Sequence, residues 1–400
     1  GITIAQNALR ALEKIDPDLS ERVAAAGPQN ITTLMQDSRT GKTILKINAS
    51  WSERKRRYGP ARYVPMMRSK LHAELLRSID PARIHYDSSF ASFSQNDSSV
   101  VLKLEDGSEH EGTLLVGTDG IKSKVRKCLH DLYPADLGPE PLVTFSNFSL
   151  WGGKCSGVTP PDQLKNTFAW AMGENESICL SLPVSSTETI WSYGTVTEKP
   201  FQVLMGKEKE LRDPIKPNPA SWLVMRTSEY HDKTFIKDYI LSTEDEDFMC
   251  WDIYELNRMG WSGRKWGVNR VTLMGDAAHA IAPWTGQGAG LSIEDAYDLA
   301  YRLATQPDVQ KLVKAYEKTR IDRTLPFKFM ARSNIKSFLY TNSLTGIISR
   351  NIFRIANLFP PLLDQIVAPM YDYDFPTPSL SEFQEPAVVS PPSSDLPPAQ

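Results

Sequence analysis

The chain has 400 residues, a length that suits two domains or one large α/β unit with an additional layer. Its hydrophobic share of 41% and charged share of 23% exclude wholesale disorder and collagen-like repeats. The net charge of −3 gives no general attraction to nucleic acid or anionic lipid, so we expect no nucleic-acid partner. The basic cluster at residues 54–57 is typical of a solvated loop.

The four cysteines are scattered without a CxxC pair, and the six histidines form no HExxH motif. We therefore predict no disulfide framework, no metal site and a reducing compartment, the cytoplasm. No apolar run reaches the roughly 18 residues of a membrane-spanning helix. The chain opens at Gly1 rather than at Met, so N-terminal targeting is left open.

The first 140 residues alternate between helical and strand-like periodicity, which predicts the first part of an α/β domain. In chain order we expect a helix over 7–14, short strands over 29–66, a helix over 66–76, a strand over 100–104, a hairpin turn at Asp106-Gly107, a buried strand over 113–117 and a helix from about Ser123.

Residues 141–260 differ in texture, with short alternating aromatic segments separated by Gly and Pro turns, which predicts an antiparallel sheet as a second domain. A buried strand returns at 270–275 and is followed by helices over 290–304 and 308–323, which complete the first domain over 261–335. Residues 336–374 favour packed C-terminal helices over a helix lying on a membrane surface. Residues 375–400 contain seven prolines and no glycine, and we expect them to be disordered.

The most informative segment runs from Gly275 to Gly290. A buried strand delivers Gly275 and Asp276 to its carboxyl end, where open α/β sheets bind ligands and where a carboxylate can bind a sugar or ribityl hydroxyl. Gly286, Gly288 and Gly290 let the backbone approach a flat ring, and the amino end of the following helix favours negative charge there.

With Pro283 between its two halves, this segment resembles the ribityl-binding motif of the class A flavoprotein monooxygenases, the para-hydroxybenzoate hydroxylase-like group. Residues 115–126 are similar to the family's Asp-Gly motif, which contacts FAD and the incoming NAD(P)H. There Asp119 can accept hydroxyl hydrogen bonds, Gly120 lets the cofactor approach, and Arg126 is free to pair with phosphate or Asp119.

A third match is Arg68, which resembles the family's arginine on the helix beside the flavin. His279 lies within the ribityl motif, where a structural hydrogen bond is favoured over a role as a base. The resemblance implies a Rossmann-like FAD-binding domain in two parts, 1–140 and 261–335. It also implies an antiparallel substrate-binding domain over 141–260 and C-terminal helices.

The sequence departs from the family at its start. It lacks the opening strand and the G-x-G-x-x-G that holds the FAD pyrophosphate, so we expect roughly forty residues to be missing from the amino end. An N-terminally truncated FAD-binding domain is the resulting interpretation. A non-catalytic relative that acts as a binding module is the alternative that the missing phosphate loop supports.

The resemblance implies an oxidoreductase that uses FAD, NAD(P)H and O2 to hydroxylate or epoxidise a small aromatic or polyketide-like substrate of secondary metabolism, through a flavin C4a-hydroperoxide. A flavin-dependent halogenase is the nearest competitor, although a W-x-W-x-I-P segment is absent. The catalytic residues, the choice of NADH or NADPH and the oligomeric state stay open. The implied cofactor-binding residues are Arg68, Asp119, Gly120, Arg126, Gly275, Asp276, Pro283, Gly286, Gln287, Gly288, Ala289 and Gly290. We expect the substrate beside Trp170, Trp191 and Tyr193.

Overall fold

The computed structural model describes the chain from Gly1 to Phe375 with several gaps. The residues outside the description are 30, 39, 48–62, 161, 174–175, 201–218, 232–233, 258–264, 340–343, 360–371, 374 and 376–400. The basic cluster at 54–57 and nearly all of the predicted disordered tail therefore lie outside the described residues.

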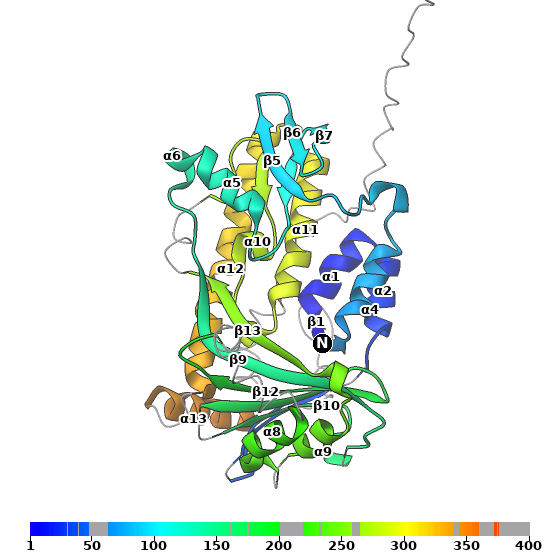
Figure 1. Ribbon diagram of the computed structural model, residues 1–400, viewed down its shortest axis with the longest axis vertical. Helices are drawn as coiled ribbons and strands as arrows, with labels where there is room; N and C mark the ends of the chain where they lie inside the picture. Colours follow the sequence, from blue (N-terminus) through cyan, green and yellow to red (C-terminus); the bar gives the residue numbers. More distant parts are fainter. Residues whose placement is uncertain are drawn as a thin grey trace, which may run out of the picture.

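An α/β region forms the upper half of the molecule in Figure 1. Its parallel pair consists of β8 (Leu115–Gly117) and β14 (Val271–Leu273), and β14 is completely buried, as its apolar sequence predicts. The helices of this region are α5 (Lys124–Leu132), α6 (Pro134–Leu137), α10 (Asp276–His279), α11 (Gly288–Thr305) and α12 (Val309–Leu339). The predicted start of α5 is confirmed, because the Ser123 hydroxyl accepts a hydrogen bond from the Arg126 amide at 2.9 Å and caps the helix.

A three-stranded antiparallel sheet stands at one end of this region. It contains β5 (Phe90–Gln95), β6 (Val100–Leu104) and β7 (Glu109–Gly112). The predicted hairpin turn between β6 and β7 is confirmed. Gly107 has φ +88°, and the Asp106 carboxylate accepts the Ser108 amide at 2.8 Å.

The amino end of the chain forms a small layer beside α11. Strands β1 (Ile2–Ala5) and β4 (Tyr63–Met66) pair antiparallel, and α1 (Gln6–Ile15), α2 (Pro17–Ala25) and α4 (Arg68–Leu76) pack on them. Their apolar faces share one cluster that includes Ile4, Leu9, Leu12, Val23 and Val64. The layer also packs on α11 through α1 (Figure 1).

A seven-stranded sheet forms the lower half, in the order β13-β9-β12-β11-β10-β2-β3. The strands are β2 (Thr32–Asp37), β3 (Thr43–Ile47), β9 (Val143–Ser156), β10 (Thr167–Met172), β11 (Ser177–Pro183), β12 (Glu188–Val196) and β13 (Met249–Leu256). All neighbours are antiparallel except β10 and β2, which pair in parallel. Two strands thus come from before residue 141, so the sheet extends beyond the range of 141–260 expected for it.

The two faces of this sheet are covered differently. Helices α8 (Pro219–Arg226) and α9 (Ile236–Leu241) cover one face, which we call the far face. The other face, called the near face, packs against α12, α13 (Leu344–Leu358) and the loop carrying Trp284. Short 3-10 turns occupy Pro81–Arg83, Asp162–Leu164, Ser228–Tyr230, Asp245–Asp247 and Pro283–Thr285. The predicted fold class, an α/β region with an antiparallel sheet and C-terminal helices, is confirmed.

The helix expected over 308–323 is longer than the sequence suggested. It continues through Pro326 to Leu339, although a proline inside a helix costs about 3 kcal/mol or more. Phe327 and Ala331, just after the proline, are buried at 2% and 0% exposure. Burial of such residues offsets the hydrogen bond that Pro326 removes.

The expected disorder from residue 375 onward is wrong for its first residue. The Phe375 side chain is buried, and its ring lies edge-on to Tyr297 with 5.3 Å between the centroids. The Arg10 guanidinium lies 5.3 Å from the centre of the same ring. Phe375 therefore packs against α1 and α11.

Candidate functional site

The two loops that the sequence singles out follow neighbouring parallel strands. β8 and β14 pair with Gly117 opposite Leu273 at their carboxyl ends. The loops that carry Asp119 and Asp276 therefore leave the same edge of the sheet. This edge is where open α/β sheets bind ligands.

Arg126 joins these two loops from inside the protein. Its guanidinium donates to the carbonyl of Ala277 at 2.8 Å, to the carbonyl of Ile121 at 2.7 Å and to the Glu140 carboxylate at 3.1 Å. The side chain is only 2% exposed. The prediction that Arg126 is free to pair with a phosphate or with Asp119 is wrong, because burial and these three bonds hold it in place.

Asp119 closes the amino end of α5. One carboxylate oxygen accepts the backbone N–H groups of Lys124 at 2.7 Å and Val125 at 3.1 Å, and the other accepts the Ser123 hydroxyl. The next residue, Gly120, has φ +78°, and an added Cβ would meet nothing within 4 Å. Asp119 thus fixes the loop, while Gly120 leaves its backbone open to a neighbour.

Gly275 and Asp276 begin α10 directly after β14. Gly275 has φ +61°, and its amide donates to the Asp295 carboxylate at 3.0 Å. An added Cβ would lie 2.9 Å from the Ser292 hydroxyl, so the position requires glycine. The Asp276 side chain that follows is exposed and can accept hydrogen bonds from a polyhydroxyl ligand.

The glycine turn brings the amino end of α11 to the same region. Gly286 ends the 3-10 turn at Pro283–Thr285 in the left-handed conformation, with φ +64°. In the described part of the chain no side chain caps α11, and an added Cβ at Gly288 would meet nothing within 4 Å. The first amides of this 18-residue helix therefore offer donors and the positive end of a helix dipole to an anionic or electron-rich group.

Gln287 and Gly290 face the protein interior. The buried Gln287 side chain accepts a hydrogen bond from the Asn7 amide at 3.0 Å. An added Cβ at Gly290 would lie 3.0 Å from the Gln287 oxygen and 3.3 Å from the Asn7 nitrogen. Close packing against Gln287 and against Asn7 of α1 therefore favours glycine at position 290, whereas its approach to a ligand stays a prediction.

Beneath the turn, α11 carries three buried carboxylates, Glu294, Asp295 and Asp298, and the first two pair with arginines of α12. Glu294 pairs with Arg320 at 2.9 Å and Arg323 at 2.8 Å, and it accepts the Asn7 amide at 2.7 Å. Asp295 pairs with Arg320 at 2.7 Å. These contacts join α1, α11 and α12 beneath the glycine turn.

Asp295 also accepts a hydrogen bond from the buried His279 imidazole. The prediction of a structural hydrogen bond for His279 is therefore confirmed. Burial alone would raise the pKa of Asp295, but its interactions with His279 and Arg320 lower it to about 2. The carboxylate therefore stays ionised and keeps its hold on the Gly275 amide.

Arg68 and Pro283 lie at the margin of this region. Arg68 is the first residue of α4 and is exposed, directly after β4. β4 itself passes the glycine turn, since an added Cβ at Gly286 would lie 3.7 Å from the Tyr63 hydroxyl. Pro283 is exposed at the start of the turn.

Aromatic side chains connect the glycine turn to the near face of the sheet. Tyr63 stacks on Phe168 with 6.2 Å between ring centroids, and Phe168 lies edge-on to Trp170 at 5.0 Å. Next to them, Trp284 from the 3-10 turn lies edge-on to Phe148 of β9 at 4.6 Å. Of the three aromatic residues predicted to line a substrate site, Trp170 therefore belongs to this surface.

Trp191 and Tyr193 lie on the opposite face of the sheet. Trp191 is completely buried under α8 and α9, and its indole donates to the Thr243 hydroxyl at 2.7 Å. Tyr193 belongs to the same cluster. Side chains alternate along β12, and both odd-numbered positions point to the far face, so these two residues lie away from the aromatic surface beside the glycine turn.

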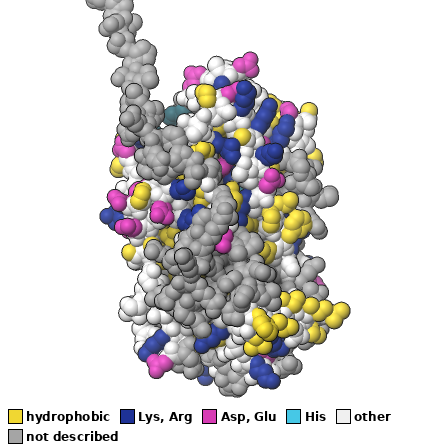
Figure 2. Space-filling model, turned by 180° about the vertical axis from the view of Figure 1, so that it is seen from behind, with side chains coloured by type: hydrophobic (Ala, Val, Ile, Leu, Met, Phe, Trp, Pro, Cys, Tyr) yellow, Lys and Arg dark blue, Asp and Glu magenta, His cyan; other side chains and the backbone are white. Residues whose placement is uncertain are grey.

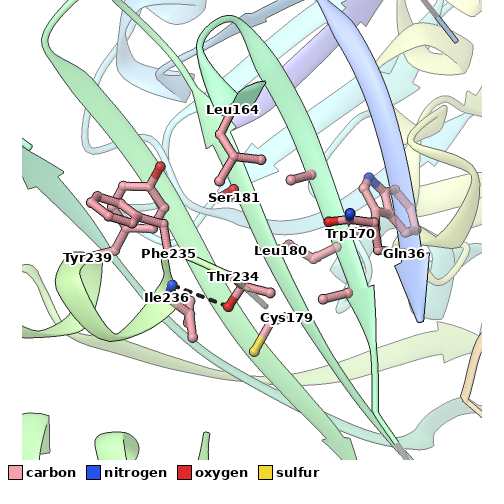
Figure 3. Close-up of a pocket in the computed structure, with 12 residues that line it drawn as sticks. Gln36, Leu164, Trp170, Cys179, Leu180, Ser181, Thr234, Phe235, Ile236 and Tyr239 are labelled. Atoms are coloured by element: carbon pink, nitrogen blue, oxygen red, sulfur yellow. Dashed lines mark hydrogen bonds between the residues drawn. The ribbon is translucent and has the colours of Figure 1, made fainter. Parts of the chain in front are cut away.

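A small pocket also opens on the far face, between β10, β11 and α9 (Figure 3). Ala171, Cys179, Phe235 and Tyr239 are among its lining residues. Its volume of about 20 Å³ has room for one water molecule. It lies away from the glycine turn and is too small for an organic substrate.

None of the helices in the described part of the chain combines the length and the apolarity needed to cross a membrane. Within the same residues, no group of three or more His, Cys, Asp and Glu side chains is arranged to hold a metal ion.

Sequence reasoning missed Asn7, Tyr63 and the buried acids of α11. The acids had a detectable signal, because Glu294 and Asp295 interrupt an apolar helix face and Arg320 repeats that pattern in α12. Charged residues are almost never fully buried unless they are paired. Asn7 and Tyr63 carried no such signal, since their roles depend on contacts with residues more than 200 positions away.

Comparison with known proteins gives a consistent picture. Residues 2–325 match the model of the FAD binding domain family. Zeaxanthin epoxidase from Oryza sativa subsp. japonica is 30% identical over 354 residues, which cover 83% of this chain and 48% of that protein. Aurachin C monooxygenase/isomerase from Stigmatella aurantiaca is 26% identical, covering 82% of this chain and 76% of that one.

Among solved structures, Klebsiella pneumoniae HpxO complexed with FAD and uric acid shares the fold, with a TM-score of 0.71 and 16% identity over 93% of this chain and 88% of that one. The chain spans about half the length of the zeaxanthin epoxidases that it matches.

Proposed function

Because the chain belongs to the FAD binding domain family, we propose that it is the flavin-binding and substrate-binding part of an FAD-dependent monooxygenase. NAD(P)H would serve as the reductant and O2 as the oxidant. The substrate would be a small, largely apolar molecule that is hydroxylated or epoxidised. The observation that carries this proposal is the uncapped amino end of α11, held beside two loops that Arg126 links together.

The described residues fit the ring and ribityl portions of the cofactor. Gly120 and Gly288 both border open space, where an added Cβ would find no neighbour within 4 Å. Asp276 supplies an exposed carboxylate for a ribityl hydroxyl. The amides of Gly288 and Ala289 supply donors for the electron-rich edge of the ring.

The other predicted residues take supporting roles in this proposal. Arg126 is a positioning residue that joins the two loops, and Asp119 holds its own loop in shape by capping α5. The exposed Arg68 would reach the cofactor from the start of α4, and Pro283 would shape the edge of the ring's seat. Gln287 and Gly290 contribute through their packing on α1.

When bound, FAD supplies the oxygen-activating redox chemistry, and the chain binds, orients and shields the reactants. The near face of the sheet supports the substrate assignment, because Tyr63, Phe168 and Trp170 form an aromatic row that begins at the glycine turn. Such a surface suits an apolar or aromatic molecule. Under this proposal, residues 1–140 and 261–335 bind the cofactor, and the seven-stranded sheet binds the substrate.

Flavin binding is the first test. FAD is titrated into the purified chain, and quenching of flavin fluorescence gives the dissociation constant. We expect Gly288→Val to weaken binding at least tenfold, because its side chain would fill the open space at the end of α11. Gly107→Val has the same change at another open glycine and should bind FAD as the unaltered chain does.

Activity is the second test. NADH or NADPH oxidation is followed with candidate apolar substrates, and 18O2 reports the oxygen transferred to the product. FAD uptake without reductant oxidation by any substrate would favour a non-catalytic relative. A folded chain that takes up no FAD, even at high concentration, would contradict the proposed site itself.

A further inference from the structure

One face of α13 carries large apolar side chains that are exposed to solvent. Six such residues on the helix, together with Phe359 directly after its end, are between 47% and 73% exposed: Leu344, Ile347, Ile348, Ile352, Ile355, Leu358 and Phe359. Their spacing of three or four residues places them on one stripe of the helix. In Figure 2 hydrophobic side chains gather in this region, at the lower right of the molecule.

The opposite side of α13 is part of the protein core. Ala356 is completely buried, and Phe353 packs against the cluster that contains Ile44 and Leu339. The helix is therefore held in place by β3 and α12, while the side chains of its apolar stripe are 47% to 73% exposed. Exposed apolar stripes of this kind mark sites that interact with proteins, membranes or ligands.

The charges next to the stripe are mostly basic, although several of them are held inside the protein. From residue 326 to residue 359 the sequence contains no Asp or Glu, and its five basic residues are Lys328, Arg332, Lys336, Arg350 and Arg354. Lys328 is buried, Arg332 pairs with Glu255 and Arg350 pairs with Asp37, so Arg354 is the basic side chain of α13 on which the proposal relies. On the neighbouring strand, Lys46 is exposed and its amide donates to the Asn357 side chain at 2.8 Å. The nearest acid with a described contact to α13 is Asp37, which is paired with Arg350 at 3.5 Å.

We propose that α13 docks this chain on the surface of an anionic lipid bilayer. The Ile and Leu side chains would enter the boundary between headgroups and acyl chains, and Lys46 and Arg354 would lie at the headgroups. Helices with an apolar face and basic flanks bind membranes in this way. The 15-residue helix lies in the plane of the membrane, because it is too short to cross one.

Two observations favour lipid over a protein partner. The stripe consists of Ile and Leu apart from one Phe, whereas the energetic centres of protein interfaces are enriched in Trp, Tyr and Arg. A two-fold contact between copies of this chain would also bring the same basic flanks together, since both partners use one surface in a two-fold interface. The proposal does not depend on the flavin, because α13 keeps its contacts without one.

Vesicle binding by the full chain tests the proposal. Vesicles of 30% phosphatidylserine in phosphatidylcholine are sedimented with the protein at 0.1 M salt, and the bound fraction gives a partition coefficient. We expect Ile348→Gln combined with Ile352→Gln to lower this coefficient at least tenfold. The pair Leu132→Gln and Leu303→Gln removes two other helical side chains of the same exposure, 51% and 50%, and should change it less than twofold.

Two further measurements test the role of the basic side chains and whether the chain forms a dimer through α13. Arg354→Gln combined with Lys46→Gln should reduce binding to the anionic vesicles about tenfold and leave binding to pure phosphatidylcholine unchanged. A second pair, Ile355→Gln and Leu358→Gln, should repeat the loss seen with the first, and circular dichroism checks that each variant is folded. The proposal is overturned if the unaltered chain does not bind anionic vesicles. It is equally overturned if sedimentation without lipid shows a dimer that the α13 variants dissociate.

Discussion

Helices α11 and α13 invert the usual distribution of side chains. α11 buries Glu294 and Asp295 completely, while α13 leaves Ile348 and Ile352 about half exposed. In α11 the carboxylates find two arginines and an asparagine on neighbouring helices, which makes their burial tolerable. One face of α13 packs against the core, and the side chains on its other face are about half exposed to solvent. The comparison teaches that burial follows from the partners a helix meets and cannot be inferred from hydrophobicity alone.

Removing a charge from inside α11 should have the largest effect. Asp295→Ala is expected to lower the free energy of unfolding by about 3–5 kcal/mol, because it leaves the Arg320 guanidinium buried without one of its counter-ions. Urea unfolding followed by tryptophan fluorescence measures the change. Asp322→Ala removes an exposed carboxylate from α12 and serves as the control. A loss below 1 kcal/mol for Asp295→Ala would show that the buried charges of α11 are not what holds the helices together.

Low pH should also lower the free energy of unfolding through Asp295, by a smaller amount than its removal does. The pKa of Asp295 is lowered from 3.8 to about 2, so the folded state binds its proton less readily than the unfolded state does. This difference stabilises the fold by about 2 kcal/mol at neutral pH, and the contribution is lost as the pH falls from about 4 to about 2. Urea unfolding of the unaltered chain and of Asp295→Asn, measured between pH 6 and pH 3, checks the sign. The stability gap between the two proteins should narrow as the pH falls, and a constant gap would contradict the assignment.

A substitution at Gly275, whose amide is bound by Asp295 of α11, should reduce stability by a smaller amount. Gly275→Ala places a side chain at φ +61° and 2.9 Å from the Ser292 hydroxyl, so we expect a loss of about 1–3 kcal/mol together with weaker FAD binding. Gly107→Ala has a similar positive φ in open space, far from α11, and should lose stability without losing FAD affinity. If Gly275→Ala and Gly107→Ala changed FAD affinity equally, Gly275 would not belong to the proposed FAD site.

The smallest effect on stability is expected in α13. Ile352→Gln should change the free energy of unfolding by less than about 0.5 kcal/mol, because the side chain is already half in water. The same exchange at the buried Leu299 of α11 should cost about 2 kcal/mol or more, since it buries an amide. Denaturant midpoints of the two variants provide the measurement. A large loss for Ile352→Gln would show that this face of α13 is packed in solution.

Local sequence signals were sufficient for most of the elements around the site. The apolar run before Gly275, the Ser123 cap and the glycines at 286 and 288 each predicted an element or turn from neighbouring residues. Local patterns could not reveal which face of a strand meets which helix. Trp170 and Trp191 have similar surroundings in the sequence, and only the packing of α8 and α9 separates them.

Arg126 illustrates the same limit at the site itself. Its position after the Asp-Gly motif suggested an arginine available to a ligand, but the acceptors it uses include the carbonyl of Ala277, 151 residues away. An arginine that donates hydrogen bonds to carbonyl groups of a neighbouring loop stabilises the fold and is not available to a ligand. Pairing of the two loops was predictable from parallel strands, whereas the residue that fastens them together was not.

The parallel pairing of β2 with β10 has a consequence for how the chain is made. Thr32 and Thr167 are register partners, so a ribosome adds 135 residues between them, which takes on the order of ten seconds. During that interval β2 has no strand to join on its β10 side, and its apolar residues Leu34 and Met35 are available to chaperones or to other nascent chains. Expression yield should therefore depend on translation speed and chaperone supply, and a fragment begun at residue 141 would expose the edge of β10 permanently.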